Sequence, residues 1–517
     1  MKVTSIGHAG LYVETAAGSI LCDPWRNPAY FASWFVFPDN SWLDWERYER
    51  PDYLYVSHLH RDHYDPESLR RVSKSATVLL PDYPTDELRS VLTDLGFRSF
   101  LQPRNGEPME VDGLRVMIQA LTAPSDGPLG DSVLALDDGE ARIVNQNDAR
   151  PPQLETIAAF GPYDAHFLQF SGAIWFPVVY DMPAAAIAEL GRRKRESGMS
   201  RALRYADTVG ARFVFPMAGP PCFLDDDLMR FNDFDRDETN IFPDQTVFLD
   251  YLVEHERDNG RLLIPASTAA LDAQGCAIQH PVADDELRAI FDDKKAYLAA
   301  YAERARPRIE AARHSWPQPG VDVLAELKRW FEPLLEEADR IRDGVGGPVL
   351  LRVGDQSIVV DFPACQVREW AGERCRYEFE VARPLVETLI HNHETDWSNS
   401  LFLSLRFTAR RVGRYNEYLY TFFKCLSEER INYVEGWYSE QDGVVEEVPL
   451  GNWLVQRRCP HLKADLTRFG ELDDQGVRTC HMHGWQFDLP TGRCLTAEDH
   501  PITARPRPEP APGGSRG

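Results

Sequence analysis

Apolar and polar positions alternate with a period of two in several short segments near the amino end. KVTSI, GLYVET and SILCD predict a hairpin and a following strand, with a Gly-containing turn at 16–18. Further strands are expected at YLYVS (53–57), TVLLP, LRVMIQAL, ARIVNQ and ARFVFPM, and helices at 84–95 and 183–206. Strands that alternate with helices and carry polar residues in their exit loops predict a layered α/β sandwich.

The pattern becomes helical from about 284 to 342, where VLAELKRWFEPLLEEADRI has apolar residues at helical spacing. PVLLRVGDQSIVVDF predicts a β-hairpin that turns at Gly354-Asp355, SLFLSLRFTARR a strand, and RYNEYLYTFFKCL a helix. We therefore divide the chain into a first domain at 1–283, an α+β middle domain at 284–427, a last domain at 428–505 and a tail at 506–517. The tail is rich in Pro and Gly and is expected to be disordered.

Charge and composition narrow the classes of partner. The 81 acidic residues outnumber the 56 basic ones, and the formal net charge of −25 argues against a nucleic-acid or anionic-membrane partner. A small molecule or a cationic electron-donor protein fits better. The amino end lacks a signal-peptide pattern, and no run of about eighteen apolar residues would span a membrane. Nine scattered cysteines indicate a reducing compartment, so we expect a cytoplasmic protein.

The loop YVSHLHRDHYD (55–65) places His58, His60, Asp62 and His63 in the pattern H-x-H-x-D-H directly after an expected strand. Imidazole and carboxylate groups at this spacing are typical of a metal site, and alone the loop suggests zinc and an activated water. An incidental His-rich loop is the less favoured alternative.

A second motif lies about four hundred residues away. Cys459-x-His461 and Cys480-x-x-His483 supply two thiolates and two imidazoles, which is the ligand pattern of a Rieske [2Fe–2S] cluster. His481 is a spare imidazole, which we expect to lie outside the ligand set. A zinc knuckle uses the same four side chains, but C-P-H with C-x-x-H-G-W is much more specific to the Rieske pattern. Because such a cluster only moves electrons, another site must use them.

The loop H-x-H-x-D-H after a strand, together with GHAG and LCDPW, resembles the metallo-β-lactamase fold. The resemblance implies that His58 and His60 hold one metal and that Asp62 and His63 hold a second. The fold normally adds two further histidines and an Asp at a strand end. LTAPSDGPLGDS and FPMAGPPCF stand where the histidines are expected, and Asp148 (with Asn147 as its rival) is the surviving carboxylate candidate. His166 could be a late ligand but is more often a core residue.

An incomplete site with open positions suits O₂ and substrate at a mononuclear non-haem Fe(II) better than a pair of zinc ions. DYLYVSHLHRDHYD, FSGAIWFPVV, FVFPMAGP and the carboxyl-terminal Rieske pattern together resemble CMP-N-acetylneuraminate hydroxylase and its bacterial relatives. That family combines a Rieske cluster with a metallo-β-lactamase-like domain and uses O₂ and an external electron donor to hydroxylate a nucleotide sugar. In the hydroxylase the Rieske domain comes first, whereas here it follows, so the substrate is left open.

The expected architecture is therefore a metallo-β-lactamase-like αββα sandwich, an α+β middle domain and an all-β Rieske domain. The expected function is a Rieske-dependent monooxygenase that oxidises a C–H bond or an amine nitrogen of a small polar metabolite. A metallo-hydrolase with a regulatory cluster is the alternative. An external reductase or electron carrier is the expected partner, and a homo-oligomer is expected only by analogy with other Rieske oxygenases. The loop at 389–397 holds His391 and His393, which form a third metal site, a bridge between the cluster and the catalytic iron, or an ordinary polar loop.

Overall fold

The computed structural model describes residues 1–122, 128–151, 154–172, 174–316, 320–413, 415–441, 443, 445–460, 463–480, 485–496 and 500–507. In this part of the chain, we find no helix with both the length and the apolar character needed to cross a membrane.

The first domain contains an eight-stranded sheet in the order β14-β13-β1-β2-β3-β4-β5-β6. Strands β3 to β6 run parallel, and the remaining pairs are antiparallel. The strands are β1 (Lys2–Gly7), β2 (Gly10–Thr15), β3 (Gly18–Cys22), β4 (Tyr53–Tyr55), β5 (Thr77–Leu79), β6 (Ser99–Leu101), β13 (Thr268–Leu271) and β14 (Cys276–Gln279). The predicted hairpin and its following strand are thus present, and β4 ends directly before the His-rich loop.

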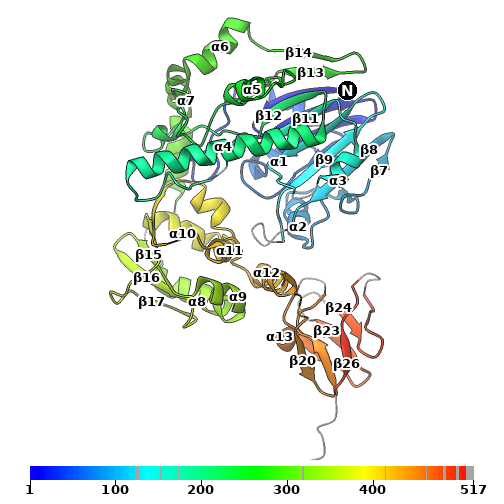
Figure 1. The fold of residues 1–517 in the computed structure, drawn as a ribbon, viewed down its shortest axis with the longest axis vertical. Coiled ribbons are helices and arrows are strands. Elements are labelled where there is room, and N and C mark those ends of the chain that lie inside the picture. Colours follow the sequence, from blue (N-terminus) through cyan, green and yellow to red (C-terminus); the bar gives the residue numbers. More distant parts are fainter. Residues whose placement is uncertain are drawn as a thin grey trace, which may run out of the picture.

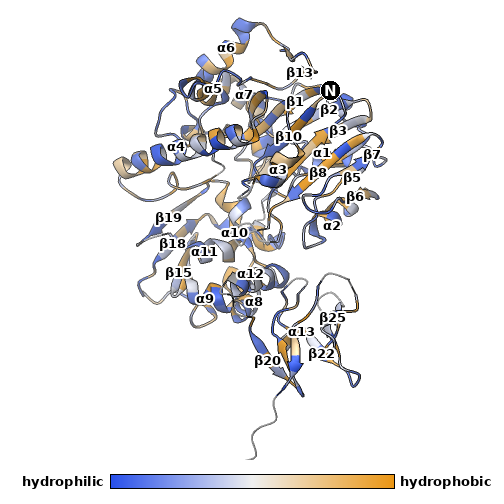
Figure 2. Ribbon diagram, turned by 45° about the vertical axis from the view of Figure 1, so that its right-hand side comes forward, coloured by the Kyte–Doolittle hydropathy of each residue, from blue (hydrophilic) through white to orange (hydrophobic). Residues whose placement is uncertain are grey.

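A second, six-stranded sheet has the order β12-β11-β10-β9-β8-β7, in which β10, β11 and β12 are parallel. Its strands are β7 (Met109–Val111), β8 (Leu114–Ala120), β9 (Ser132–Asp137), β10 (Arg142–Asn147), β11 (Ala165–Gln169) and β12 (Phe213–Met217). Apolar residues from both sheets, among them Val13, Ile20, Leu134 and Ile143, form one buried cluster. In Figure 2, strands of these sheets such as β8 are largely apolar, whereas α4 carries many polar residues.

Helices cover the outer faces of the two sheets. α1 (Pro66–Arg71) and α2 (Glu87–Asp94) pack on the first sheet, and α3 (Glu155–Phe160), α4 (Ala184–Val209) and α5 (Gln245–Glu254) pack on the second. Figure 1 shows α4 running across β11 and β12. Short helical turns occur at Trp45–Tyr48 and Met229–Phe231. The order helix, sheet, sheet, helix confirms the predicted αββα sandwich.

Helices α6 (Asp284–Asp292) and α7 (Lys294–Ser315) follow the sandwich and pack on Phe35, Phe37 and Cys222 of the first domain. A five-stranded sheet in the order β17-β16-β15-β18-β19 comes next, and it shares one core with the helices around it. Its elements are α8 (Val323–Glu337), α9 (Asp339–Val345), β15 (Pro348–Val353), β16 (Gln356–Asp361), β17 (Gln366–Glu369), β18 (Tyr377–Val381), α10 (Arg383–His391), β19 (Phe407–Arg411), α11 (Glu417–Lys424) and α12 (Glu428–Gln441). That core also takes in Trp25, Trp34 and Phe223, so the middle domain packs directly on the sandwich.

The hairpin predicted at Gly354-Asp355 is β15–β16, and Gly354 has the left-handed φ of +60° that its tight turn needs. The strand expected over SLFLSLRFTARR is wrong in its first half, where Ser398–Phe402 forms a π-type helical turn. Trp397 and Leu401 are one helical turn apart and are both buried in the middle core, which favours the turn over a strand.

The carboxyl-terminal domain is built from two small antiparallel sheets. One contains β20 (Glu447–Leu450), β21 (Trp453–Gln456) and β26 (Ala504–Pro506), and the other contains β22 (Gly470–Leu472), β23 (Val477–Cys480), β24 (Trp485–Asp488) and β25 (Arg493–Cys494). A short helix, α13 (Leu466–Phe469), precedes β22. α12 lies between this domain and the rest of the middle domain (Figure 1). Of the tail predicted to be disordered, 508–517 lies outside the described residues.

Candidate metal centre

The His-rich loop begins where the parallel strand β4 ends and finishes at α1, whose first turn is capped by Asp65. The Asp65 carboxylate accepts hydrogen bonds from the amides of Glu67 and Ser68, at 3.1 and 3.3 Å. Between these two fixed ends, His58, Asp62 and His63 are buried and His60 is half-buried. The loop therefore points its side chains inward at the edge of the sheet.

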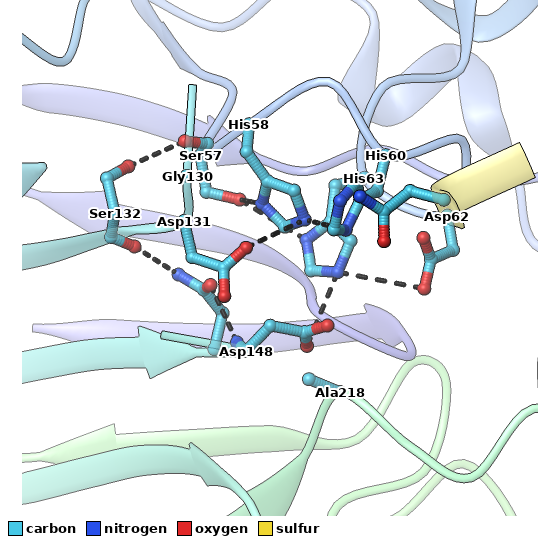
Figure 3. A network of polar contacts seen from close by, with 12 residues as sticks. Ser57, His58, His60, Asp62, His63, Gly130, Asp131, Ser132, Asp148 and Ala218 are labelled. Carbon is cyan, nitrogen blue, oxygen red and sulfur yellow. Dashed lines mark hydrogen bonds and ion pairs between the residues drawn. The ribbon is translucent and has the colours of Figure 1, made fainter. Parts of the chain in front are cut away.

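Two groups of potential metal ligands lie side by side in this loop and its surroundings (Figure 3). His58 and His60 gather with Asp148, and Asp62 and His63 gather with His8; within each group the donor atoms lie within 4.8 Å of one another. Each group is a set of two imidazoles and one carboxylate, the set that holds iron in many non-haem oxygenases. The groups divide the loop in the way that the metallo-β-lactamase resemblance implies.

His8 is a candidate ligand that the motif spacing does not reveal. It follows β1 in a tight turn with a left-handed φ of 54°, and its Nε2 lies 3.0 Å from Oδ2 of Asp62. Its Nδ1 is buried without a hydrogen-bond partner. In the sequence, the GHAG segment indicates only the fold. Its spacing does not show that the His8 imidazole lies beside a loop some fifty residues away.

The sequence offers two candidates for the ligand at the end of β10, Asp148 and Asn147. Asp148 Oδ1 lies 3.4 Å from Nε2 of His63, which places it between the two groups. Asn147 instead donates to the carbonyl of Ser132 at 2.9 Å and accepts from the amide of Asp148. The structure therefore brings Asp148 to the site and uses Asn147 to hold the chain around it.

The two histidines normally added by the fold are replaced by other residues. Asp131, in the segment where the first was expected, places Oδ1 3.5 Å from Nε2 of His58. Ala218, labelled in Figure 3, stands in the segment where the last was expected, and its amide donates to the carbonyl of His8 at 3.1 Å. Residues 123–127 of the first segment lie outside the described residues. The site is thus richer in carboxylate than the two-metal pattern from which it departs.

Outer contacts fix the imidazoles in position. Asp23 Oδ2 lies 3.0 Å from Nδ1 of His63 and accepts a hydrogen bond from the Ser57 hydroxyl at 2.7 Å. The same hydroxyl lies 2.9 Å from Nδ1 of His58. Tyr30 donates a hydrogen bond to Oδ1 of Asp62. Contacts of this kind orient the ring nitrogens that face a metal.

The electrostatics of the centre favour a cation. Burial lowers the pKa of His63, but the carboxylates of Asp148, Asp62 and Asp23 outweigh it and raise that pKa well above its usual value. Burial lowers the pKa of His58 well below its usual value, and neighbouring His60 and His63 add to the lowering. Apart from the 3.4 Å ion pair between them, Nε2 of His63 and Oδ1 of Asp148 are buried without a hydrogen-bond partner. Such unpaired donors and acceptors, made of imidazole and carboxylate, fit an iron or zinc ion.

His166, the suggested late ligand, belongs to neither group. It is buried in β11, and its Nε2 lies 2.8 Å from Oε1 of Gln146. Burial lowers the pKa of His166 to about 3, so its imidazole is neutral at neutral pH. It is a core residue, the commoner of the two roles considered for it.

A pH dependence of stability follows from this buried imidazole. Between its usual pKa of 6.5 and about 3, the unfolded chain binds a proton that the folded chain does not. The stability contribution is complete above pH 6.5 and falls as the pH is lowered, by up to about 1.4 kcal/mol per pH unit. His166→Gln will weaken the fall in the urea midpoint between pH 7 and pH 5.5, and replacing the exposed His314 by Gln will leave it unchanged. An unchanged pH dependence in His166→Gln would rule this assignment out.

Cys459 and Cys480 of the second motif lie in one buried cluster of the carboxyl-terminal domain. Cys480 ends β23 opposite Trp485, and Cys459 lies in a tight turn whose Lys463 amide donates to its carbonyl at 3.0 Å. His461, His483 and the spare His481 lie outside the described residues. Two cysteines buried together at loop ends fit the cysteine half of a Rieske ligand set.

The loop at 389–397 takes no part in a third group. His391 and His393 are exposed, and His393 stacks on Trp330 with a centroid distance of 4.4 Å. The two groups named above are those that the described residues contain. Asp396 of this loop nevertheless lies near the metal-binding loop, because its carboxylate opposes the lowering of the His60 pKa by burial.

Comparison with known proteins agrees with this architecture. Residues 2–147 match a family described as "Beta-lactamase superfamily domain", 323–440 one described as "Rv3818-like, SCP2-like domain", and 437–505 one described as "Rieske [2Fe-2S] domain". The predicted metallo-β-lactamase and Rieske domains are thereby confirmed.

Three known proteins illustrate the likeness. "Putative Rieske 2Fe-2S iron-sulfur protein Rv3818" of Mycobacterium tuberculosis (strain ATCC 25618 / H37Rv) is 51% identical over 517 residues, 98% of this chain and 100% of that protein. Cytidine monophosphate-N-acetylneuraminic acid hydroxylase of Cricetulus griseus is 30% identical over 98 residues, 18% of this chain and 17% of that protein. The structure of CmlA, a diiron β-hydroxylase from Streptomyces venezuelae, aligns with a TM-score of 0.36 and 18% identity, over 52% of this chain and 54% of that one.

The resemblance to CMP-N-acetylneuraminate hydroxylase that the motifs suggested is confirmed by the second of these matches. The first covers nearly the whole of both chains. The protein therefore belongs to the family of Rieske 2Fe-2S iron-sulfur proteins that includes the mycobacterial protein.

Proposed function

We propose that this protein is a Rieske-dependent iron oxygenase that oxidises a C–H bond or an amine nitrogen of a small polar metabolite. The observation that carries the proposal is the pair of adjacent two-imidazole, one-carboxylate groups in a chain that also has a Rieske domain. Hydrolysis consumes no electrons, whereas reduction of O₂ does, so a Rieske domain in the same chain favours the oxygenase. The match with cytidine monophosphate-N-acetylneuraminic acid hydroxylase, whose name states a hydroxylation, supports the same class of reaction.

Both groups are proposed to hold iron. The sequence alone favoured a single iron, because it showed only one full set of donors. His8 supplies the donor that was missing from the second set, and Asp131 offers a further carboxylate to the first. When bound, the cluster supplies electrons one at a time and the iron ions bind and reduce O₂.

The chain's own residues give these groups a closed and ordered surrounding. The ring of Trp25 packs on that of His8 with a centroid distance of 4.8 Å, and Tyr30 packs on Trp34 at 4.9 Å. Both Trp25 and Trp34 are almost fully buried. The aromatic stretch upstream of the loop therefore shields the ligands of the second group from water, which suits a centre that handles reactive oxygen.

Helix α12 supports a route for electrons within one chain. Asn432 accepts hydrogen bonds from Arg458, next to Cys459, and from the amide of Asp465, at 3.0 and 3.3 Å. Two residues earlier, Arg430 donates to Glu87 of the sandwich at 2.6 Å and lies 3.7 Å from Asp396. One turn of this helix thus joins the loop of the cluster's cysteine to the surroundings of His60.

Metal analysis tests the proposal against the hydrolase alternative. The protein, purified without oxygen, is expected to contain about four iron atoms per chain, two in the cluster and two in the sandwich. When a reductase supplies the electrons and the buffer contains no dithionite, the protein is expected to consume O₂. Two zinc ions per chain beside the cluster, with hydrolysis of lactone or ester substrates and no O₂ uptake, would favour the hydrolase instead.

A further inference from the structure

Three basic side chains gather beside the metal centre without a carboxylate among them. Arg150, Lys194 and Arg201 form this cationic cluster. In the described part of the chain, none of the three makes an ion pair with Asp or Glu, although acidic residues outnumber basic ones by 81 to 56. Nearby arginines such as Arg142, Arg192, Arg193 and Arg195 do pair with a carboxylate. Arg150 and Lys194 are exposed and Arg201 is half-buried, so an anion in solvent can reach all three.

Helix α4, which carries Lys194 and Arg201, lies against the loop of Arg150, because the Tyr205 hydroxyl donates to the carbonyl of Pro151 at 3.3 Å. The three positive charges therefore repel one another. Burial, together with the charge of Arg150, lowers the pKa of Arg201 to about 10. Burial also lowers the pKa of Lys194, again with contributions from Arg150 and Arg201. Like charges held together in this way cost stability unless an anion joins them.

The cluster lies at the same sheet edge as the metal ligands. Arg150 follows Asp148 by two residues in the loop after β10, and it donates to Oε1 of Gln169 at the end of β11, at 3.0 Å. Gln169 in turn donates to the carbonyl of Ala218 at 3.3 Å. The amide of Ala218 donates to the carbonyl of His8 at 3.1 Å, so these contacts connect the cluster to the metal centre through neighbouring strand ends.

One aromatic ring, that of Phe176, lies beside the cationic cluster. Nζ of Lys194 lies 5.8 Å from the centroid of the Phe176 ring, and Cζ of Arg411 lies 5.1 Å from the same centroid. Arg411 adds a fourth positive charge to this side, from β19 of the middle domain. The surroundings thus combine positive charge with an apolar surface, as a site for an organic anion would.

We propose that Arg150, Lys194 and Arg201 bind an oxyanion, either a phosphate or a carboxylate, that forms part of the substrate. An anion there would sit at the edge of the iron centre, and the rest of the molecule would reach the metals. Arginine and lysine suit this role because both donate charge-assisted hydrogen bonds to phosphate and carboxylate oxygens. This inference rests on the proposed function, because it assigns the substrate of that same centre to the anionic metabolites.

The test measures anion binding by the full-length metal-loaded protein, without turnover. Inorganic phosphate and acetate are titrated separately by calorimetry, so that the two arms distinguish phosphate from carboxylate. Lys194→Gln and Arg201→Gln are each expected to weaken binding about tenfold or more, because each removes a charged hydrogen-bond donor. Arg201→Lys is expected to retain most of it. Replacing the exposed Arg288 of α6 by Gln serves as the control.

Binding of neither anion by the wild-type protein would overturn the inference, as would equal affinity in Lys194→Gln, Arg201→Gln and the wild type. An anion held by the metals alone would give that second result, since the variants leave the ligands in place. Near-ultraviolet circular dichroism and the thermal midpoint without anion establish that each variant is folded. Because anion binding is measured without turnover, its result can be interpreted even if the protein proves not to be an oxygenase.

Discussion

Replacing Asp148 by alanine will empty both ligand groups at once, whereas replacing His8 will empty one. Asp148 belongs to the group of His58 and His60, and its Oδ1 also lies 3.4 Å from Nε2 of His63. His8 contacts only the group of Asp62. Iron is therefore expected to fall from about four atoms per chain to about two in Asp148→Ala and about three in His8→Ala.

Turnover with O₂ will follow the iron content. Loss of an outer contact already costs about 10- to 100-fold in metal affinity or activity, so loss of a ligand is expected to cost at least about 100-fold. Asp285→Ala, at an exposed position of α6, is a matched control, because it makes the same substitution outside the centre. Full iron content in Asp148→Ala, with the cluster's electron paramagnetic resonance signal unchanged, would contradict the placement of a metal at this carboxylate.

Gly436→Ala on α12 will slow electron transfer between the cluster and the metal centre. A Cβ at this position would lie 2.1 Å from Cβ of Lys463, in the loop that carries Cys459. The Lys463 Cβ is fixed to its backbone and cannot turn away, so the Rieske domain must shift from the helix. Electron transfer slows as the two centres move apart, so we expect the shifted Rieske domain to give a measurably lower rate.

The same substitution favours the helix itself, because alanine is a better helix former than glycine by about 1 kcal/mol. A slower reaction in a helix of greater intrinsic stability would therefore point to docking rather than to folding. The measurement is the rate at which the reduced cluster is oxidised by O₂, and its resonance signal should keep its shape. Glu428→Ala, at an exposed position of the same helix, is the control. Equal rates in Gly436→Ala and the wild type would remove α12 from the electron route.

How much the sequence could predict depended on how local each feature was. The H-x-H-x-D-H loop and the paired Cys-His motifs are short and marked by spacing, so the chain alone is enough to infer their chemistry. His8 and Asp131 could not be inferred in this way, because each reaches the centre only through the pairing of strands distant in sequence. Arg150 and Arg201 come together in the same manner, from a loop and a helix some fifty residues apart.

Secondary structure was likewise predictable where it depends on local sequence. Strands β1 to β5, β8, β10 and β12 and helices α2 and α4 were predicted from periodicity, because each buries one face in the cores of the sandwich. Strands β6, β7, β9, β11, β13 and β14 and helices α3 and α5 were not predicted. Periodicity failed at Ser398–Phe402, where a run of apolar residues is compatible with either a strand or a helical turn. Burial of Trp397 and Leu401 in the core between the middle domain and the sandwich decided it, and that core is a property of the assembled chain.

A single-turnover oxidation tests most directly whether electrons from the carboxyl-terminal cluster are consumed at the amino-terminal metals. The protein is reduced, freed of reductant without oxygen and mixed with O₂, and the resonance signal of the reduced cluster is followed. The account predicts fast loss of the signal in the wild type and a loss slower by about 100-fold or more in Asp148→Ala. Equal decay in the two proteins would show that the cluster reacts with O₂ without the metal centre, and would contradict the account.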